Sequence, residues 1–128
     1  MRKIIKILAV IFVCFVIVVG VGFFYITSGL KAGQNLEVNE INLGNVKDGT
    51  YTGIFNFKRW SNELQVDIEN SKIVDIKIVK DVKIPKLGVS QQLFYSVINQ
   101  QSTKVDMVAG ATVTSKAYLK AIENAVAK

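Results

Sequence analysis

A continuous run of apolar residues opens the chain. Residues 7–26 read ILAVIFVCFVIVVGVGFFYI and contain no charge. A helix rising about 1.5 Å per residue needs about 20 apolar residues to cross the hydrocarbon core of a bilayer. The pattern therefore predicts one transmembrane helix within residues 1–26.

Positive charge lies mainly before this run. Arg2, Lys3 and Lys6 precede it, while only Lys31 follows closely. Because short segments rich in Lys and Arg stay in the cytoplasm, we expect a cytoplasmic N-terminus and an extracytoplasmic remainder. A cleaved signal peptide is the alternative, but its apolar stretch is about 7–15 residues long and ends at small residues. We prefer an uncleaved, single-pass anchor in the cell membrane.

Polar and small residues separate the anchor from the next patterned region. Residues 27–47 mix Ser, Gly, Asn, Gln and Glu with isolated apolar positions. This composition is typical of a linker. We expect it to hold a single domain, residues 48–128, away from the membrane.

Three segments of this domain have the period of β-strands. Residues 51–57 are rich in β-branched and aromatic side chains, and residues 64–69 and 74–78 alternate between apolar and polar. Turn-forming residues at 58–62 and 70–72 separate the segments. Alternation is typical of strands with one buried and one solvated face, so we predict an antiparallel meander.

The C-terminal half changes to a helical period. Val89, Leu93 and Val97 recur every four residues after a loop that contains Pro85, and a second apolar stripe follows in residues 115–126. Three strands with one apolar face are barely stable alone, so we expect these helices to cover the sheet. The predicted fold class is α+β, with an N-terminal transmembrane helix, a small antiparallel sheet and C-terminal helices.

Composition excludes several kinds of chemistry. The chain has 128 residues, no His and one Cys, Cys14, which lies inside the apolar run. It therefore cannot build a zinc, copper or iron site from His and Cys, an internal disulfide, or a Ser–His or Cys–His nucleophile pair. We expect no metal site and no catalytic residue, and any reaction chemistry must come from a bound cofactor.

Charge argues against nucleic acid as a partner. The formal net charge is +6, and it falls to +3 without the three cations that precede the apolar run. The remaining positive charge is weak and scattered along the chain. A solvated surface explains it.

The candidate chemistry lies in a loop of small residues before the last helix. Residues 105–115 read VDMVAGATVTS. The start of a helix presents free N–H groups and the positive end of the macrodipole, so this loop is a candidate cradle for a phosphate. An ordinary turn followed by a hydroxyl cap from Thr112 or Thr114 explains the same residues.

The same loop resembles a flavin-attachment motif. Residues 106–115, followed by an Ala-rich helix, are similar to the pattern Asp-x-x-Ser/Thr-Gly-Ala-Thr/Ser of the FMN-binding domain family, which also occurs in the flavin subunits of sodium-pumping and Rnf-type redox complexes. The resemblance implies FMN as cofactor. It also implies that a dedicated transferase, using FAD, joins the FMN phosphate to Thr112. Ala109 stands where the family has Ser or Thr.

Other segments resemble this family in the same order. Residues 48–53 (DGTYTG) are similar to its opening strand, and residues 70–76 (NSKIVDI) to its hairpin. Residues 84–88 (IPKLG) resemble the loop, commonly Thr-Pro-Gly-x-Gly, that lies against the isoalloxazine ring, with Ile84 and Lys86 in place of Thr and Gly. The resemblance extends from the first of these segments to the C-terminus.

The resemblance and the residues together give a set of cofactor-binding positions. They are Asp106, Ala109, Gly110, Ala111, Thr112, Val113, Thr114, Ser115, Leu87 and Gly88. We expect amides near Val113 to hold the phosphate and Leu87 to shield one face of the ring. A threonine hydroxyl is a poor nucleophile without a base, so attachment should need an outside enzyme. Trp60, in a turn, is expected to be an exposed turn aromatic or a satellite packing residue rather than a residue stacked on a flavin.

We therefore expect a membrane-anchored, extracytoplasmic FMN-binding electron-transfer protein rather than a stand-alone enzyme. The resemblance implies as partners an FAD-dependent flavin transferase and a redox donor and acceptor, which are proteins or a quinone. Two other readings stay open from the residues alone. One is a non-redox module that binds an anion at residues 109–115, and the other is a structural anchor without a cofactor.

Overall fold

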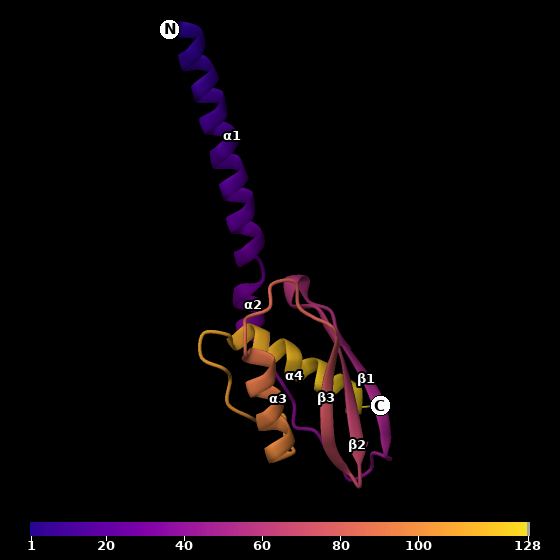
Figure 1. Cartoon of the computed structure of the whole chain (residues 1–128). Helices are drawn as coiled ribbons and strands as arrows, with labels where there is room; N and C mark the ends of the chain where they lie inside the picture. Colours follow the sequence, from indigo (N-terminus) through magenta and orange to yellow (C-terminus); the bar gives the residue numbers. More distant parts are fainter. Residues whose placement is uncertain (128) are drawn as a thin grey trace.

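A long helix projects from a domain in which two further helices lie on one face of a three-stranded sheet (Figure 1). The computed structural model describes residues 1–127. In chain order the elements are α1 (Arg2–Thr27), α2 (Leu30–Gln34), β1 (Gly49–Phe55), η1 (Lys58–Trp60, a 3-10 turn), β2 (Asn62–Glu69), β3 (Lys72–Lys80), α3 (Val89–Gln100) and α4 (Thr112–Val126). The predicted α+β fold is confirmed, with its N-terminal apolar helix, antiparallel sheet and C-terminal helices.

Between Ile7 and Ile26, helix α1 is apolar on all sides. None of its 26 residues is buried, and large side chains such as Phe12 and Phe24 are 67% and 72% exposed. A helix of this kind is stable only where an apolar surrounding covers it. By length and composition α1 suits a membrane span, and an N-terminal signal sequence has the same character.

The sheet is a meander of order β1-β2-β3, and both strand pairs are antiparallel. Along β2, Leu64, Val66 and Ile68 are at most 1% exposed, and they alternate with partly exposed polar residues. Because successive side chains point to opposite faces of a strand, this row forms the part of the core that the helices cover.

Helix α4 lies close to the backbone of β1. A side chain at Gly53 would place its Cβ 1.8 Å from the carbonyl oxygen of Ala121. On α4, Ala117, Ala121 and Ala125 recur every four residues and are fully buried. Small residues on both elements therefore let the two backbones approach, and this packing fixes the position of α4 on the sheet.

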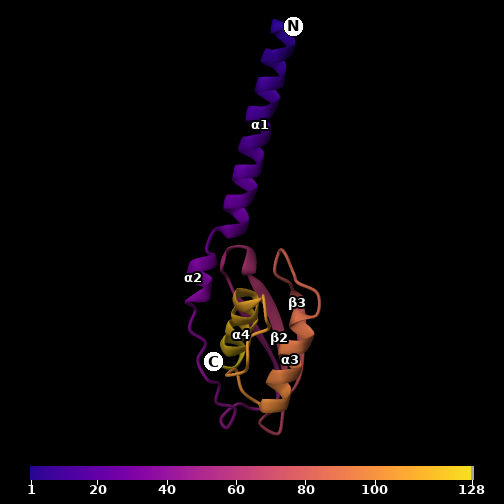
Figure 2. The ribbon, with the colours of Figure 1, turned by 90° about the vertical axis from the view of Figure 1, so that its left-hand side faces the viewer.

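Much of the segment predicted to be a linker packs against the domain. In α2, Gly33 is buried, and a Cβ at this position would meet Cγ1 of Val113 at 2.4 Å. Ile41 and Leu43 are buried in the core. Figure 2 shows α4 between the α2 side and α3. A mainly polar composition hid these few docking positions, because their partners lie far away in the sequence.

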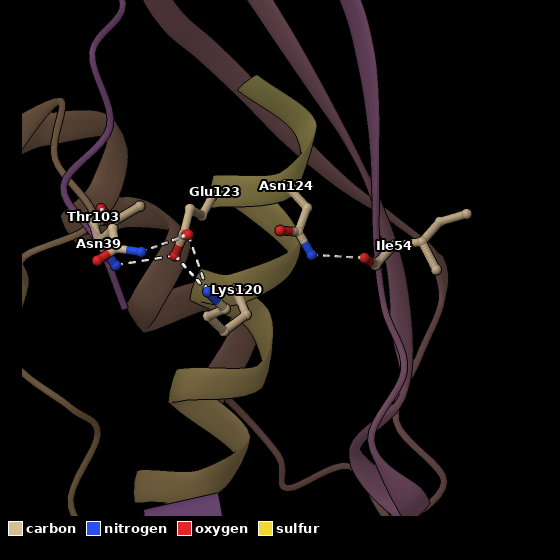
Figure 3. A network of polar contacts seen from close by, with 6 residues as sticks. All are labelled: Asn39, Ile54, Thr103, Lys120, Glu123 and Asn124. Atoms are coloured by element: carbon tan, nitrogen blue, oxygen red, sulfur yellow. Dashed lines mark hydrogen bonds and ion pairs between the residues drawn. The ribbon is translucent and has the colours of Figure 1, made fainter. Parts of the chain in front are cut away.

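A polar network holds the same segment to the last turns of α4 (Figure 3). The backbone N–H and Nδ2 of Asn39 donate to the Glu123 carboxylate at 3.0 and 3.1 Å, and Lys120 pairs with the same carboxylate at 3.0 Å. Thr103 Oγ1 donates to the Asn39 carbonyl at 2.6 Å. Burial alone would raise the pKa of Glu123, but the hydrogen bonds from Asn39 and Lys120 outweigh it and lower the pKa below its ordinary value.

The domain also contacts the end of α1 directly. Arg59 Nε in η1 donates to the carbonyl oxygen of Ile26 at 3.1 Å. Lys58 Nζ donates to Ser28 Oγ at 2.7 Å. The end of the domain that carries η1 therefore abuts the end of α1. That residues 27–47 hold the domain away from a membrane stays a prediction.

Candidate functional site

The loop before α4 folds back on the start of that helix. Gly110 has a φ of +74°, a left-handed conformation that glycine adopts without strain. The N–H of Ala111 donates to the carbonyl of Val108 at 3.0 Å. The N–H of Val108 in turn donates to Ser115 Oγ at 3.2 Å. These two bonds fix the loop against the first turn of α4.

Helix α4 begins without a hydroxyl cap. It starts at Thr112, before the predicted start at residue 115, and its N-cap residue is Ala111, whose methyl side chain makes no cap. The interpretation as a turn capped by Thr112 or Thr114 is therefore wrong. Both hydroxyls lie inside the helix, because the helix continues back to the turn at Gly110.

The start of α4 leaves three backbone donors free. The first bond of the helix runs from the N–H of Ser115 to the carbonyl of Ala111 at 2.9 Å. Within residues 1–127, no group accepts a hydrogen bond from the N–H of Thr112, Val113 or Thr114. Three adjacent donors at the positive end of a helix dipole are suited to bind an anion.

These donors open onto a pocket of about 250 Å³ between three elements. Its walls are Gly110, Ala111, Thr112, Val113 and Thr114 at the start of α4, Arg59 and Trp60 of η1, and Leu30 and Gln34 of α2. Sites for drug-sized ligands range from about 300 Å³ upward, so this pocket suits the polar end of a larger molecule. Thr112 is exposed at its mouth.

A cation from η1, Arg59, lines the same pocket. Arg59 holds its guanidinium carbon 4.0 Å from the centre of the Trp60 ring, and only its Nε donates to a described residue. Its two terminal nitrogens have no partner within residues 1–127 and remain available. A guanidinium and free helix amides are a donor set that binds phosphate.

Trp60 is a core residue rather than an exposed turn aromatic. It is 1% exposed and stacks on Phe57 with ring centres 5.8 Å apart. The expectation of an exposed turn aromatic is wrong, because η1 folds the Trp60 ring under Arg59 and into the core. That Trp60 does not stack on a flavin stays a prediction. Its charged neighbours in the sequence, Lys58 and Arg59, indicated a solvent-exposed turn, so nothing in the sequence indicated that Trp60 is buried.

The structure gathers only part of the predicted site. Five predicted residues, Gly110 to Thr114, line the pocket together. Ser115 is fully buried, and its hydroxyl accepts from Val108, so it shapes the loop instead of facing the pocket. Asp106 and Ala109 are exposed and lie outside the pocket wall. Their roles toward a cofactor stay predictions.

The second predicted loop reaches the site through a different residue from the one expected. Leu87 is fully exposed, and with Gly88 it lines a separate hollow of about 350 Å³. Lys86 instead extends to the attachment loop, where its Nζ donates to the carbonyl of Gly110 at 3.2 Å. The contact of Leu87 with a flavin ring stays a prediction.

Sequence reasoning missed the wall opposite the helix. Arg59 was assigned to a turn, and Leu30 and Gln34 to a linker. A cation beside the only tryptophan of the chain is a weak signal for Arg59. No local pattern indicated that α2 lines the pocket. Its position depends on close packing at Gly33, where any side chain would clash with Val113.

Comparison with known proteins identifies a family over the C-terminal half of the chain. A family model described as FMN-binding domain matches residues 61–127, just over half of the chain. The match covers the start of α4 with Thr112, whereas Arg59 and all of α2 lie before it. No curated protein matches the sequence significantly.

Proposed function

The chain belongs to the FMN-binding domain family and has FMN as its cofactor, and we propose that it is a membrane-anchored, extracytoplasmic electron-transfer protein with FMN joined to Thr112. One observation carries the proposal. The uncapped start of α4 leaves three amides without a partner within residues 1–127, beside a pocket that is also lined by Arg59 and by the exposed residue Thr112.

The residues of this pocket would bind and orient the cofactor through its phosphate. The amides of Thr112, Val113 and Thr114 would donate to the phosphate oxygens, and the positive end of α4 would stabilise the negative charge. Arg59 would add charge-assisted hydrogen bonds from the opposite wall. Once bound, FMN supplies the uptake and release of electrons.

Covalent attachment is proposed at Thr112 because, of the two threonines that line the pocket, Thr112 is exposed and Thr114 is buried. The chain has no His to take the hydroxyl proton, so an outside flavin transferase would supply the base. The Thr112 Oγ–phosphorus bond would form as the pyrophosphate bond of FAD breaks, with AMP as the leaving group. A phosphate already seated on the amides would keep the same partners after attachment.

The donor and acceptor are proposed to lie in or at the membrane. The start of α4 and α2 are at the end of the domain from which α1 projects (Figures 1 and 2). With α1 in the bilayer, this arrangement favours a flavin near the membrane surface, within reach of a membrane-bound redox protein or a quinone. The cations Arg2, Lys3 and Lys6 favour a cytoplasmic N-terminus and an extracytoplasmic domain.

The test is the intact mass of the full chain after co-expression with an FAD-dependent flavin transferase. We expect the unmodified sequence and a Thr52→Ala control to carry the FMN mass increment and the visible flavin absorbance. Thr52 is exposed on β1, away from the pocket. Thr112→Ala should lose the increment entirely. An increment at unchanged stoichiometry in Thr112→Ala would contradict attachment at this residue.

A further inference from the structure

A second pocket lies where the end of α1 meets the domain. Its volume is about 410 Å³, and its lining residues are Tyr25, Ser28, Lys58, Arg59 and Lys83. Three of these five residues are cationic and none is acidic. Within residues 1–127, none of the three cations forms an ion pair with a carboxylate. This pocket, called the junction pocket below, therefore concentrates uncompensated positive charge.

Specific contacts assemble the junction pocket. Lys58 reaches across the end of α1 to Ser28 Oγ, and Arg59 Nε reaches the Ile26 carbonyl. The N–H of Lys83 donates to the Arg59 carbonyl at 2.9 Å, which brings the segment after β3 beside η1. Cations from two distant parts of the sequence thus meet around the last turn of one helix.

Backbone conformation at the junction depends on a glycine. Gly29 has a φ of +82°, and a Cβ at this position would lie 2.7 Å from Cδ of Lys58. Lys58 itself has a φ of +46°, which non-glycine residues rarely adopt. The absent side chain at Gly29 therefore gives the Lys58 stem its path to Ser28, and the position of the ammonium is defined by the fold.

The position of the pocket along α1 identifies its ligand. The apolar run ends at Ile26, so with α1 across a bilayer, Tyr25 and Ser28 lie at the depth of the lipid headgroups. Tyrosine is typical of this interface. The negatively charged groups that are abundant at this depth are lipid phosphates.

We propose that the junction pocket binds the headgroup of an anionic phospholipid in the leaflet where α1 leaves the membrane. The inference rests on the membrane anchorage in the proposed function. The two pockets share Arg59, so Lys58 and Lys83 are the cations that line the junction pocket alone. A pocket lined by Lys58, Lys83 and the shared Arg59, with no carboxylate in its lining, favours a headgroup with net negative charge over a zwitterionic one, whose own cation these residues would repel.

These cations do not conflict with the orientation inferred from the N-terminus. Orientation is set by Lys and Arg within about 15–20 residues of the span while the chain is inserted. Lys58, Arg59 and Lys83 lie farther along the chain and reach the membrane only after the domain has folded. Lipid binding would then hold η1, and with it the Arg59 wall of the flavin pocket, at a fixed position on the bilayer.

The test measures lipids retained by the full chain in native mass spectrometry, from detergent micelles containing equal amounts of phosphatidylglycerol and phosphatidylcholine. The variant is Lys58→Gln with Lys83→Gln, which leaves Arg59 of the flavin pocket intact. The matched control is Lys47→Gln with Lys72→Gln, two exposed lysines just before β1 and at the start of β3, at the end of the sheet away from η1. Lys83→Gln alone is a second variant, because the Lys83 ammonium has no hydrogen-bond partner within residues 1–127 whose loss could disturb folding.

We expect the unmodified chain to retain phosphatidylglycerol preferentially. An interfacial lysine contributes roughly a fivefold change in binding, so Lys83→Gln should weaken this retention about fivefold and the double variant about twenty-fivefold. The control pair should leave it unchanged. Equal retention of both lipids by the unmodified chain, or an equal loss in the control pair, would overturn the inference. So would complete displacement of phosphatidylglycerol by millimolar inorganic phosphate, which would indicate a free-phosphate site.

Flavin absorbance of the same samples separates this inference from the proposed function. Preferential retention of phosphatidylglycerol by a chain that has no FMN after co-expression with the transferase supports the lipid site and contradicts only the flavin carrier. A flavin-loaded chain without lipid preference contradicts only the lipid site.

Discussion

The two ends of α4 differ in whether their polar groups have hydrogen-bond partners. At the last turns, Glu123 accepts from Asn39 and Lys120, and Asn124 Nδ2 donates to the Ile54 carbonyl at 2.9 Å (Figure 3). At the first turn, three amides have no partner within residues 1–127 and face a pocket. Satisfied polar groups stabilise the fold, and unsatisfied ones are available to a ligand. The last turns therefore hold the domain together, whereas the first turn is the part that binds.

A single substitution on β1 should displace the whole of α4 and so disturb both of its ends. Gly53→Ala would bring a Cβ to 1.8 Å from the Ala121 carbonyl oxygen, so α4 must move away from the sheet. We expect a loss of about 3 kcal/mol in the free energy of unfolding, because overpacking against backbone has no cheap relaxation. Urea unfolding in detergent micelles, followed by Trp60 fluorescence, measures it.

The matched control for this change is Gly44→Ala. A Cβ at Gly44 meets only the side-chain oxygen of Asn42, at 3.3 Å. This variant should unfold close to the unmodified chain. A Gly53→Ala variant with unchanged stability would show that α4 is not held against β1 as described.

Removing the carboxylate at the last turns should cost stability without affecting the cofactor. Glu123→Ala leaves the donors of Asn39 and Lys120 without their acceptor, at a cost of about 2 kcal/mol in unfolding free energy. FMN incorporation should stay complete in the fraction that folds. Glu69→Ala, at an exposed residue, is the control. Loss of FMN from folded Glu123→Ala would break the division between the two ends.

Removing the cation beside the first turn of α4 should weaken FMN binding without a comparable cost in stability. In a Thr112→Ala background, where FMN binds without a covalent bond, Arg59→Gln should weaken FMN affinity about tenfold through lost charge-assisted hydrogen bonds. Fluorescence titration of FMN measures the affinity. Lys104→Gln, at an exposed lysine outside the pocket, should leave the affinity unchanged. Equal FMN affinities for Arg59→Gln and Lys104→Gln would show that Arg59 does not contribute to FMN binding.

The smallest expected effect is a pH dependence of stability at the last turns. The pKa of Glu123 is lower in the folded chain than its ordinary value of 4.5. Its contribution is therefore complete above about pH 4.5 and is lost as the pH falls through the folded pKa. The unfolding free energy of Glu123→Gln should decline less steeply with acid than that of the unmodified chain. Parallel curves would contradict a favourable role for the ionised carboxylate.

The sequence predicted the elements whose pattern repeats locally. The alternation at Leu64, Val66 and Ile68 marked β2, and the four-residue period at Val89 and Leu93 marked α3, because burial on one face imposes these periods. The loop at residues 106–115 was found by its resemblance to a family motif, and the family is confirmed.

The rest of the pocket depends on packing between distant segments. Arg59, Leu30 and Gln34 meet the start of α4 only after α2 docks through Gly33, and no periodicity records that contact. The sequence also did not reveal the uncapped start of α4. Thr112 and Thr114 are residue types that cap helices, and only the backbone shows that both lie inside the helix. Local sequence patterns could therefore predict neither the long-range packing nor the start of α4, which lies three residues before the predicted one.

The most direct test of the division along α4 is an amide NMR titration of the Thr112→Ala chain with FMN in detergent micelles. We expect the largest chemical-shift changes at the N–H groups of residues 112–114 and at the side chain of Arg59, with the signals of residues 120–124 unmoved. Saturable shifts confined to residues 84–88 or to the last turns of α4, with those of residues 112–114 unchanged, would contradict the account.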